Sequence, residues 1–180
     1  TAKIAVLAAT NNWNAYNNYG GRGNYINAEG LPPRPTVNAR QDLSRYSEKD
    51  MNVFWKSPND VYPPISFERP EFGNVVGKNE ELTSPMSGRL ASSCAPGMWR
   101  LLGWLEREGY EYDLYSDNQL RDGTLDLDAY ETLLTEIHPE YWYREEYERV
   151  KDWVFERGGK FMYLGGNGLD CEVEYVDETT

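Results

Sequence analysis

The segment Tyr143–Gly168, with the sequence YREEYERVKDWVFERGGKFMYLGGNG, predicts a helix that returns directly to a buried strand. Its first half has Tyr147, Val150 and Val154 at helical spacing, and the glycine pair after Arg157 ends that pattern. The short apolar run KFMYL that follows is typical of a strand covered on both faces. A helix that leads straight into such a strand indicates a parallel sheet with helices packed on it.

The same alternation continues toward the N-terminus of the chain. Four further segments have a periodic pattern: Lys3–Ala9, Met98–Glu108, Tyr112–Ser116 and Ala129–Ile137. The first and third predict strands, and the second has the apolar stripe of a helix that Gly109 ends. The fourth is ambiguous between helix and strand, and Pro139 ends it because proline disfavours helix in the residue before it. We therefore predict an α/β fold of three layers with a mostly parallel sheet, as a single domain over residues 1–180.

The composition excludes several classes of protein. The 180 residues include 30 acidic and 18 basic side chains, and the net charge of −12 repels the phosphates of nucleic acids. No apolar run approaches the roughly 18 residues of a membrane-spanning helix. Two cysteines are too few for a disulfide scaffold or a zinc cluster, and 14 tyrosines, 6 tryptophans and 5 phenylalanines argue against disorder. We expect a soluble, cytoplasmic globular protein that binds neither nucleic acid nor membranes.

Charge and composition change between the two halves of the chain. Residues 1–90 contain 9 acidic and 10 basic side chains, whereas residues 91–180 contain 21 acidic and 8 basic ones. Eight of the ten prolines lie between Pro32 and Pro85, and 12 asparagines lie in the first 80 residues. Proline and asparagine disfavour helices and central strands, so residues 26–90 are predicted to form a loop-rich insertion within the domain. Such long insertions commonly build a site or contact a partner.

Ligands of parallel α/β sheets bind beyond the carboxyl ends of the strands, so the loops at those ends hold the candidate site. Three loops qualify: Thr10–Tyr25, His138–Trp142 and Gly165–Gly168. They carry phenols, the only histidine of the chain, a carboxylate and a carboxamide. The run GGRG lacks the Lys-Ser/Thr ending of a phosphate-binding loop, and no second histidine exists to activate Cys94 as a nucleophile.

Each candidate side chain also has a purely structural interpretation. A single histidine is more often structural than catalytic, and Glu140 is spaced as a first-turn acid of the helix that follows it. Asn167 among glycines is typical of a turn residue with positive φ. The phenols of Tyr16, Tyr19 and Tyr25 are equally suited to packing the insertion against the domain.

Several motifs of the chain resemble those of one known family: Asn12–Asn18, Ser66–Pro70, Trp104–Tyr110, His138–Trp142 and Gly158–Asn167. The family is the large (beta) subunit of N,N-dimethylformamidase, and the resemblance extends over nearly the whole chain. Members of the family are much longer, which implies that this chain is either a piece of their C-terminal catalytic region or an unusually short relative. The resemblance also implies a fold similar to class I glutamine amidotransferase domains, in agreement with the α/β pattern.

The resemblance implies an active site with a mononuclear iron, as Fe³⁺, held by two tyrosines and one glutamate. Glu140 matches the glutamate, and Tyr16 and Tyr25 match the two tyrosines. Some members have an additional tyrosine where this chain has Trp13, so two other phenols stay open as ligands: Tyr19 and Tyr62.

Two further residues of this implied site match a histidine and an asparagine of the family, His138 and Asn167. Three hard anionic oxygens suit ferric iron, which would act as a Lewis acid on an amide carbonyl and on bound water. His138 and Glu140 would then move protons, and Asn167 would orient the amide or stabilise its oxyanion. Trp13 and Trp142 would make the pocket small and apolar.

The implied function is that of an iron-dependent amidohydrolase, a hydrolase acting on linear amide C–N bonds. It would cleave a small N-substituted amide of the formamide type into a carboxylic acid and an amine. The expected assembly is a homo-oligomer that also binds a small subunit. Two alternatives stay open at this point. In the first, the domain is a non-catalytic binding or assembly module whose insertion contacts the partner. In the second, the iron site acts on a different substrate.

Overall fold

A four-stranded parallel sheet lies at the centre of the computed structural model, which describes residues 2–16, 65–68 and 95–180. The strands are ordered β2-β1-β3-β5 and have these bounds: β1 Ile4–Ala8, β2 Tyr112–Ser116, β3 Thr132–Ile137 and β5 Lys160–Gly165. Every neighbouring pair in this sheet is parallel, so the predicted α/β fold with a mostly parallel sheet is confirmed. Two short strands, β4 (Tyr141–Trp142) and β6 (Cys171–Glu172), form a separate parallel pair.

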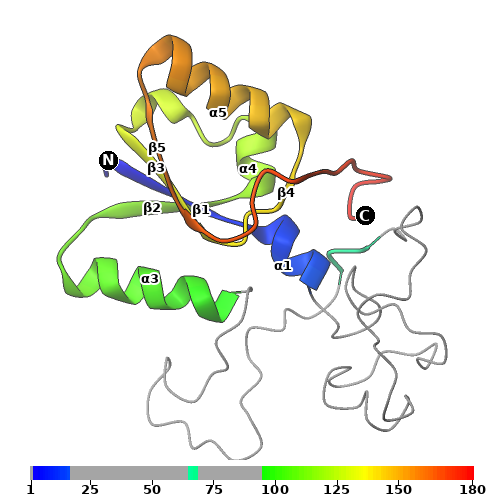
Figure 1. Cartoon of the computed structure of the whole chain (residues 1–180), viewed down its shortest axis with the longest axis horizontal. Coiled ribbons are helices and arrows are strands. Elements are labelled where there is room, and N and C mark those ends of the chain that lie inside the picture. The colour runs from blue at the N-terminus through cyan, green and yellow to red at the C-terminus, as the bar shows by residue number, and fades with distance from the viewer. Residues whose placement is uncertain (1, 17–64, 69–94) are drawn as a thin grey trace, which may run out of the picture.

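Helices cover both faces of the sheet. They have these bounds: α1 Thr10–Tyr16, α3 Ala95–Arg107, α4 Asp117–Asp122 and α5 Arg144–Arg157, with a 3₁₀ turn at Leu127–Ala129. Figure 1 shows α3 on one face, α4 and α5 on the other, and α1 at one end of the sheet. The described part of the chain therefore has three layers. None of the described helices is long and apolar enough to cross a membrane.

Most element boundaries agree with the sequence pattern. Gly109 after α3 and Gly158 after α5 have φ angles of 78° and 75°, the left-handed conformation in which glycine ends a helix. The ambiguous segment Ala129–Ile137 divides into the end of the 3₁₀ turn and strand β3. Of the predicted insertion, only residues 65–68 are among the described ones.

The prediction of a loop directly after β1 is wrong for Thr10–Tyr16, which forms α1. This helix contains three asparagines, which have poor intrinsic helix propensity. It is also only seven residues long, so contacts with the rest of the fold have to stabilise it.

The core has two parts, one on each face of the sheet. In β1, Ala5 and Leu7 belong to the part under α4 and α5, whereas Val6 and Ala8 belong to the part under α3. The first part continues with these residues: Leu120, Leu125, Leu127, Tyr130, Leu133, Trp142, Val150 and Trp153. The second part continues with these: Met98, Leu105 and Leu134. Strand β1 is therefore covered on both faces, which explains its unbroken apolar sequence.

The strand order places the carboxyl ends of β1 and β3 where the path of the chain reverses. From β1 the chain passes through α3 to β2 on one side, and from β3 it passes through α5 to β5 on the other. Because α3 and α5 lie on opposite faces (Figure 1), these two strand ends flank the position where open α/β sheets bind ligands. Helix α1 follows β1 at this edge, and residues 138–140 follow β3.

Candidate functional site

The carboxyl ends of β1 and β3 bring a phenol, an imidazole and a carboxylate together. The Tyr16 hydroxyl, at the end of α1, donates a hydrogen bond of 2.9 Å to Oε2 of Glu140. The same hydroxyl lies 3.4 Å from Nδ1 of His138, and the two rings meet edge to face with centroids 6.1 Å apart. Glu140 is only 6% exposed, so the carboxylate in this cluster is largely withdrawn from solvent.

A strained turn after β3 presents both His138 and Glu140 to Tyr16. Ile137, the last residue of β3, has a φ of 77°, which is an outlier for a β-branched residue. A hydrogen bond of 2.8 Å from the Glu140 N–H to the His138 carbonyl then closes the turn. Such strain persists only where the surrounding structure imposes it, and it is concentrated at functional sites.

The loop after β5 lies along this turn and holds it by backbone hydrogen bonds. These bonds run from Gly166 to the Ile137 carbonyl at 2.6 Å, from Leu169 to the Pro139 carbonyl at 3.0 Å, and from Cys171 to the Glu140 carbonyl at 2.9 Å. A Cβ at Gly166 would lie 2.5 Å from Nε2 of His138, so only glycine allows this close approach. Gly165 and Gly166, whose Cβ atoms would meet Ile137 and His138, therefore pack this loop against the turn.

Three of the predicted site residues, Tyr16, His138 and Glu140, thus lie in one cluster. The structural interpretation of Glu140 as a first-turn acid of α5 is wrong, because β4 lies between Glu140 and that helix. Glu145 and Glu146 occupy the first turn instead. The sequence suggested that Glu140 belongs to the first turn of α5 because the two-residue strand β4 between them has no recognisable pattern.

Asn167 lies on the loop beside His138, between Gly166 and Gly168, and is exposed. It does not have the positive φ expected of a turn asparagine, since that conformation falls on Leu169 with a φ of 53°. The remaining predicted phenols and the excluded nucleophile lie outside the described residues: Tyr19, Tyr25, Tyr62 and Cys94.

The two tryptophans predicted to wall the pocket belong to the core. Trp142 is 5% exposed and packs edge to face against Phe161 under α5, and it lies in β4 rather than in the predicted loop. Its indole N–H donates to the Pro139 carbonyl at 2.5 Å and so holds the turn from the core side. Trp13 is partly buried and packs against the part of the core under α3.

Sequence reasoning missed two residues beside Glu140. The side-chain donor atoms of Glu140, Asp170 and Cys171 lie within 4.8 Å of one another, a grouping able to hold a metal ion. Burial raises the pKa of the Cys171 thiol, and the charges of Glu140 and Asp170 raise it further, which favours the protonated thiol. Asp170 ends the loop that carries Asn167, and Cys171 begins β6. Their position directly after the GGNGL run at a strand end is the signal that could have identified them.

A second phenol, that of Tyr163, also lies near the carboxylate of Glu140. Its hydroxyl donates to the Gly166 carbonyl at 2.7 Å. Burial raises the pKa of Tyr163, and the charge of Glu140 raises it further, so this phenol holds its proton tightly.

The oxygens at this edge of the sheet fit the iron that the family resemblance implies. Phenolate and carboxylate are hard donors suited to a hard cation such as Fe³⁺. The Tyr16 hydroxyl and Glu140 Oε2 are 2.9 Å apart, and loss of the phenol proton would make both of them anionic donors. The described residues therefore include two of the three implied ligands, and Tyr25 lies outside them.

Comparison with known proteins identifies relatives of this chain. A family model described as "N,N-dimethylformamidase beta subunit-like, C-terminal" matches residues 1–179. The N,N-dimethylformamidase beta subunit of Alcaligenes sp is 36% identical over 84 residues, which is 46% of this chain and 11% of that protein. The protein of the same name from Paracoccus aminophilus is 33% identical over 75 residues, 41% of this chain and 10% of that protein. The matched region spans about a tenth of the length of these relatives.

Proposed function

The chain belongs to the N,N-dimethylformamidase beta subunit-like family, and from this premise we propose that its site hydrolyses a linear amide C–N bond. The observation that carries the proposal is the contact of Tyr16 with Glu140 and His138 at the carboxyl ends of two adjacent parallel strands. A phenol, a carboxylate and an imidazole in contact are able to bind a hard cation and to move a proton.

The substrate that we propose is a small N-substituted amide of the formamide type, which water cleaves into a carboxylic acid and an amine. The name of both relatives, N,N-dimethylformamidase beta subunit, supports this substrate class. The same name supports a partner subunit, and we propose that this chain works in a multi-subunit enzyme.

Iron in the ferric state is the metal that we propose, with Tyr16, Tyr25 and Glu140 as its ligands and Tyr19 and Tyr62 as alternative phenols. When bound, such a metal polarises an amide carbonyl and lowers the pKa of bound water. The separation of 2.9 Å between the Tyr16 hydroxyl and Glu140 Oε2 supports this pair of ligands.

His138 is proposed to move the proton that hydrolysis requires. Its imidazole accepts a proton from the water that adds to the amide carbon and returns it to the nitrogen as the C–N bond breaks. Tyr16 at Nδ1 and Gly166 at Nε2 restrict the orientation of the ring. Asn167, on the loop beside His138, is proposed to orient the amide or to stabilise its oxyanion through its NH₂ group.

The test uses the purified chain, ferric loading and a panel of small amides that includes N,N-dimethylformamide. We expect the wild type to bind iron, to develop a tyrosinate-to-iron charge-transfer band and to release an amine from at least one amide. Glu140→Gln should lose the band and the hydrolysis but keep its fold, whereas Glu145→Gln, an acid in the first turn of α5, should keep all three. Protein that stays colourless and metal-free after loading contradicts the metal assignment.

A non-catalytic binding or assembly module is the competing function, and the contacts among the described residues do not favour it. It predicts that Glu140→Gln changes subunit assembly and that the wild type hydrolyses no amide of the panel. Light scattering of both proteins, measured beside the amide assay, separates the two functions.

A further inference from the structure

The first turn of α1 has no capping side chain of its own. The Trp13 N–H donates to the Ala9 carbonyl at 2.9 Å, which makes Ala9 the residue at the cap position. Alanine has no side-chain acceptor, and the first turn of α1 contains no acidic residue. The N–H groups at the start of a helix need acceptors from outside the helix, so another part of the chain has to supply one.

Asp117 supplies this acceptor from the first turn of α4, directly after β2. Its Oδ2 accepts a hydrogen bond of 2.6 Å from the Asn11 N–H and one of 3.1 Å from the Thr10 hydroxyl. Asn11 is the second residue of α1, and its N–H is one of those that a capping side chain ordinarily binds. Asp117 therefore caps α1 from another element of the same chain, 106 positions after Asn11 in the sequence.

The environment of Asp117 makes this a well-defined anchor. Asp117 is only 4% exposed, and a carboxylate at a helix N-terminus is attracted by the helix dipole. Burial raises the pKa of Asp117, and the bonds from Asn11 and Thr10 oppose that rise. Glu146 of α5 is the titratable neighbour, and its pKa is raised first by its own burial and then by the charge of Asp117.

Helix α1 connects the residues that Asp117 binds to the site at its other end. Tyr16 is the last residue of α1, and six residues of helical rise place it about 9 Å beyond Thr10. The Asn11 side chain also donates to the Tyr141 carbonyl at 3.3 Å, directly beside Glu140. The position of the Tyr16 hydroxyl therefore depends on where the first turn is held.

We infer that Asp117 is a positioning residue, which fixes the first turn of α1 and thereby sets the contact between the Tyr16 phenol and Glu140. Its chemical consequence rests on the proposed function, whereas the hydrogen bond between Tyr16 and Glu140 is observed independently of that function. Because Asp117 directly follows β2, the carboxyl ends of three neighbouring strands, β2, β1 and β3, contribute to one site.

The test observes Tyr16 directly in metal-free protein by NMR with ¹³C at the tyrosine ζ carbon. The Tyr16 signal is identified by its loss in Tyr16→Phe, and Glu140→Gln calibrates the displacement that follows a change of its acceptor. Asp117→Ala should move the Tyr16 signal by at least half of that displacement. Asp117→Asn keeps an oxygen acceptor and should return the signal most of the way to its wild-type position.

The matched control is Asp122→Ala, an exposed acid at the other end of α4 whose carboxylate accepts from the Thr124 N–H. It should leave the Tyr16 signal in place. Thr10→Val removes one of the two bonds at similar volume, and it should displace the signal in the same direction as Asp117→Ala but by less. It therefore tests the inference even where Asp117→Ala does not fold.

Ferric loading adds a spectroscopic readout that a purely structural role would not move. Asp117→Ala should reduce the intensity of the charge-transfer band at least threefold, with rescue by Asp117→Asn. Tyr16 signals that coincide with the wild type in every folded variant at Asp117 and Thr10 overturn the inference. Displaced signals in a wild-type background that never develops a band support the anchor and contradict only the proposed metal.

Discussion

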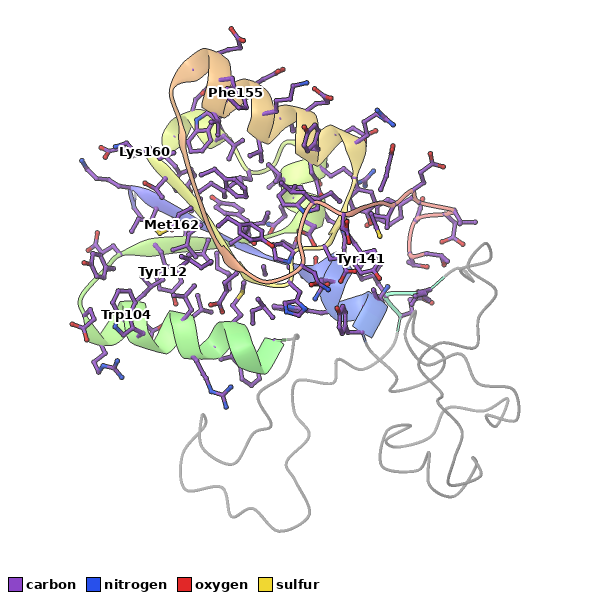
Figure 2. All side chains as sticks on the ribbon, in the orientation of Figure 1. Trp104, Tyr112, Tyr141, Phe155, Lys160 and Met162 are labelled. Atoms are coloured by element: carbon purple, nitrogen blue, oxygen red, sulfur yellow. The ribbon has the colours of Figure 1, made fainter. Side chains whose placement is uncertain are left out.

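The phenol of Tyr16 and the carboxylate of Glu140, 124 positions apart in the sequence, share a hydrogen bond of 2.9 Å. The helix after β1 contributes the phenol, and the turn after β3 contributes the carboxylate. The two meet because β1 and β3 are parallel neighbours, with Leu7 opposite Thr135 near their carboxyl ends. Figure 2 shows the side chains around Tyr141, the residue next to Glu140, where the end of the sheet approaches α1.

Removal of the Tyr16 hydroxyl should destabilise the metal-free protein. Tyr16→Phe loses a hydrogen bond to a buried carboxylate, and we expect the free energy of unfolding to fall by about 1 to 2 kcal/mol. Urea unfolding measures this change. Tyr163→Phe is the matched control, because its phenol donates to the neutral Gly166 carbonyl at an exposed position and should cost less than about 1 kcal/mol. Equal costs in the two variants would contradict the buried character of the Tyr16 contact.

A side chain at Gly166 should displace the only histidine of the chain. In Gly166→Ala the new Cβ would lie 2.5 Å from Nε2 of His138, so the ring has to move. We expect the single imidazole signal in a ¹⁵N NMR spectrum to shift and amide hydrolysis to fall at least tenfold. Gly109→Ala is the control: it strains a φ of 78° but places its Cβ in open space, so it should cost about 1 kcal/mol of stability and leave the imidazole signal unchanged.

The protein should lose stability as the pH rises from about 4.5 to about 7. Burial raises the pKa of Glu136 from 4.5 to about 7. The folded state therefore binds this proton more tightly than the unfolded state, and the stabilisation is complete below pH 4.5 and lost as the pH passes through 7. Burial raises the pKa values of Asp117 and Glu146 as well, so both act in the same direction.

Glu136→Gln isolates this contribution. Because Glu136 is only partly buried, we expect the variant to remove about 1 to 2 kcal/mol of the pH-dependent loss of unfolding free energy, less than the full pKa shift implies. The control is Glu131→Gln, since the Lys3 ammonium lowers the pKa of that exposed carboxyl and its contribution has the opposite sign. A pH profile that Glu136→Gln leaves unchanged would show that this carboxyl does not titrate in the expected range.

Ferric ion should raise the thermal midpoint of the wild type, and a chelator should reverse the rise. A ligand that binds only the folded state stabilises it by about 2.7 kcal/mol at a hundredfold excess over its Kd. Tyr16→Phe and Glu140→Gln should abolish the rise, whereas Cys171→Ser should retain it. The opposite pattern, with loss in Cys171→Ser and retention in Tyr16→Phe, would assign the metal to the group of Glu140, Asp170 and Cys171.

The sequence pattern predicted β1, β2, β5 and the two long helices because their signals are local. The prediction that β5 is covered on both faces is wrong, since Met162 and Leu164 are exposed. Strand β1 reads as an unbroken apolar run, α5 has an apolar stripe, and glycines with positive φ end α3 and α5. Helix α1 gave no such signal, because its sequence TNNWNAY has low helix propensity and its cap, Asp117, comes from another element. Trp142 was misplaced for a related reason, since an exposed loop and a two-residue strand in the core look alike in one dimension.

The sequence by itself determined the α/β class and the net negative charge. Through the family motifs it also made His138 and Glu140 candidates for the site. The fold class and the motifs can be read from residues a few positions apart, and the charge follows from composition alone. Only the tertiary structure decided which strand ends adjoin. That choice brought Tyr16 into hydrogen-bond distance of Glu140, placed Asp170 and Cys171 beside it, and made Asp117 the cap of α1. The physical reason is that these contacts join residues far apart in the chain, and their formation depends on the packing of the whole sheet.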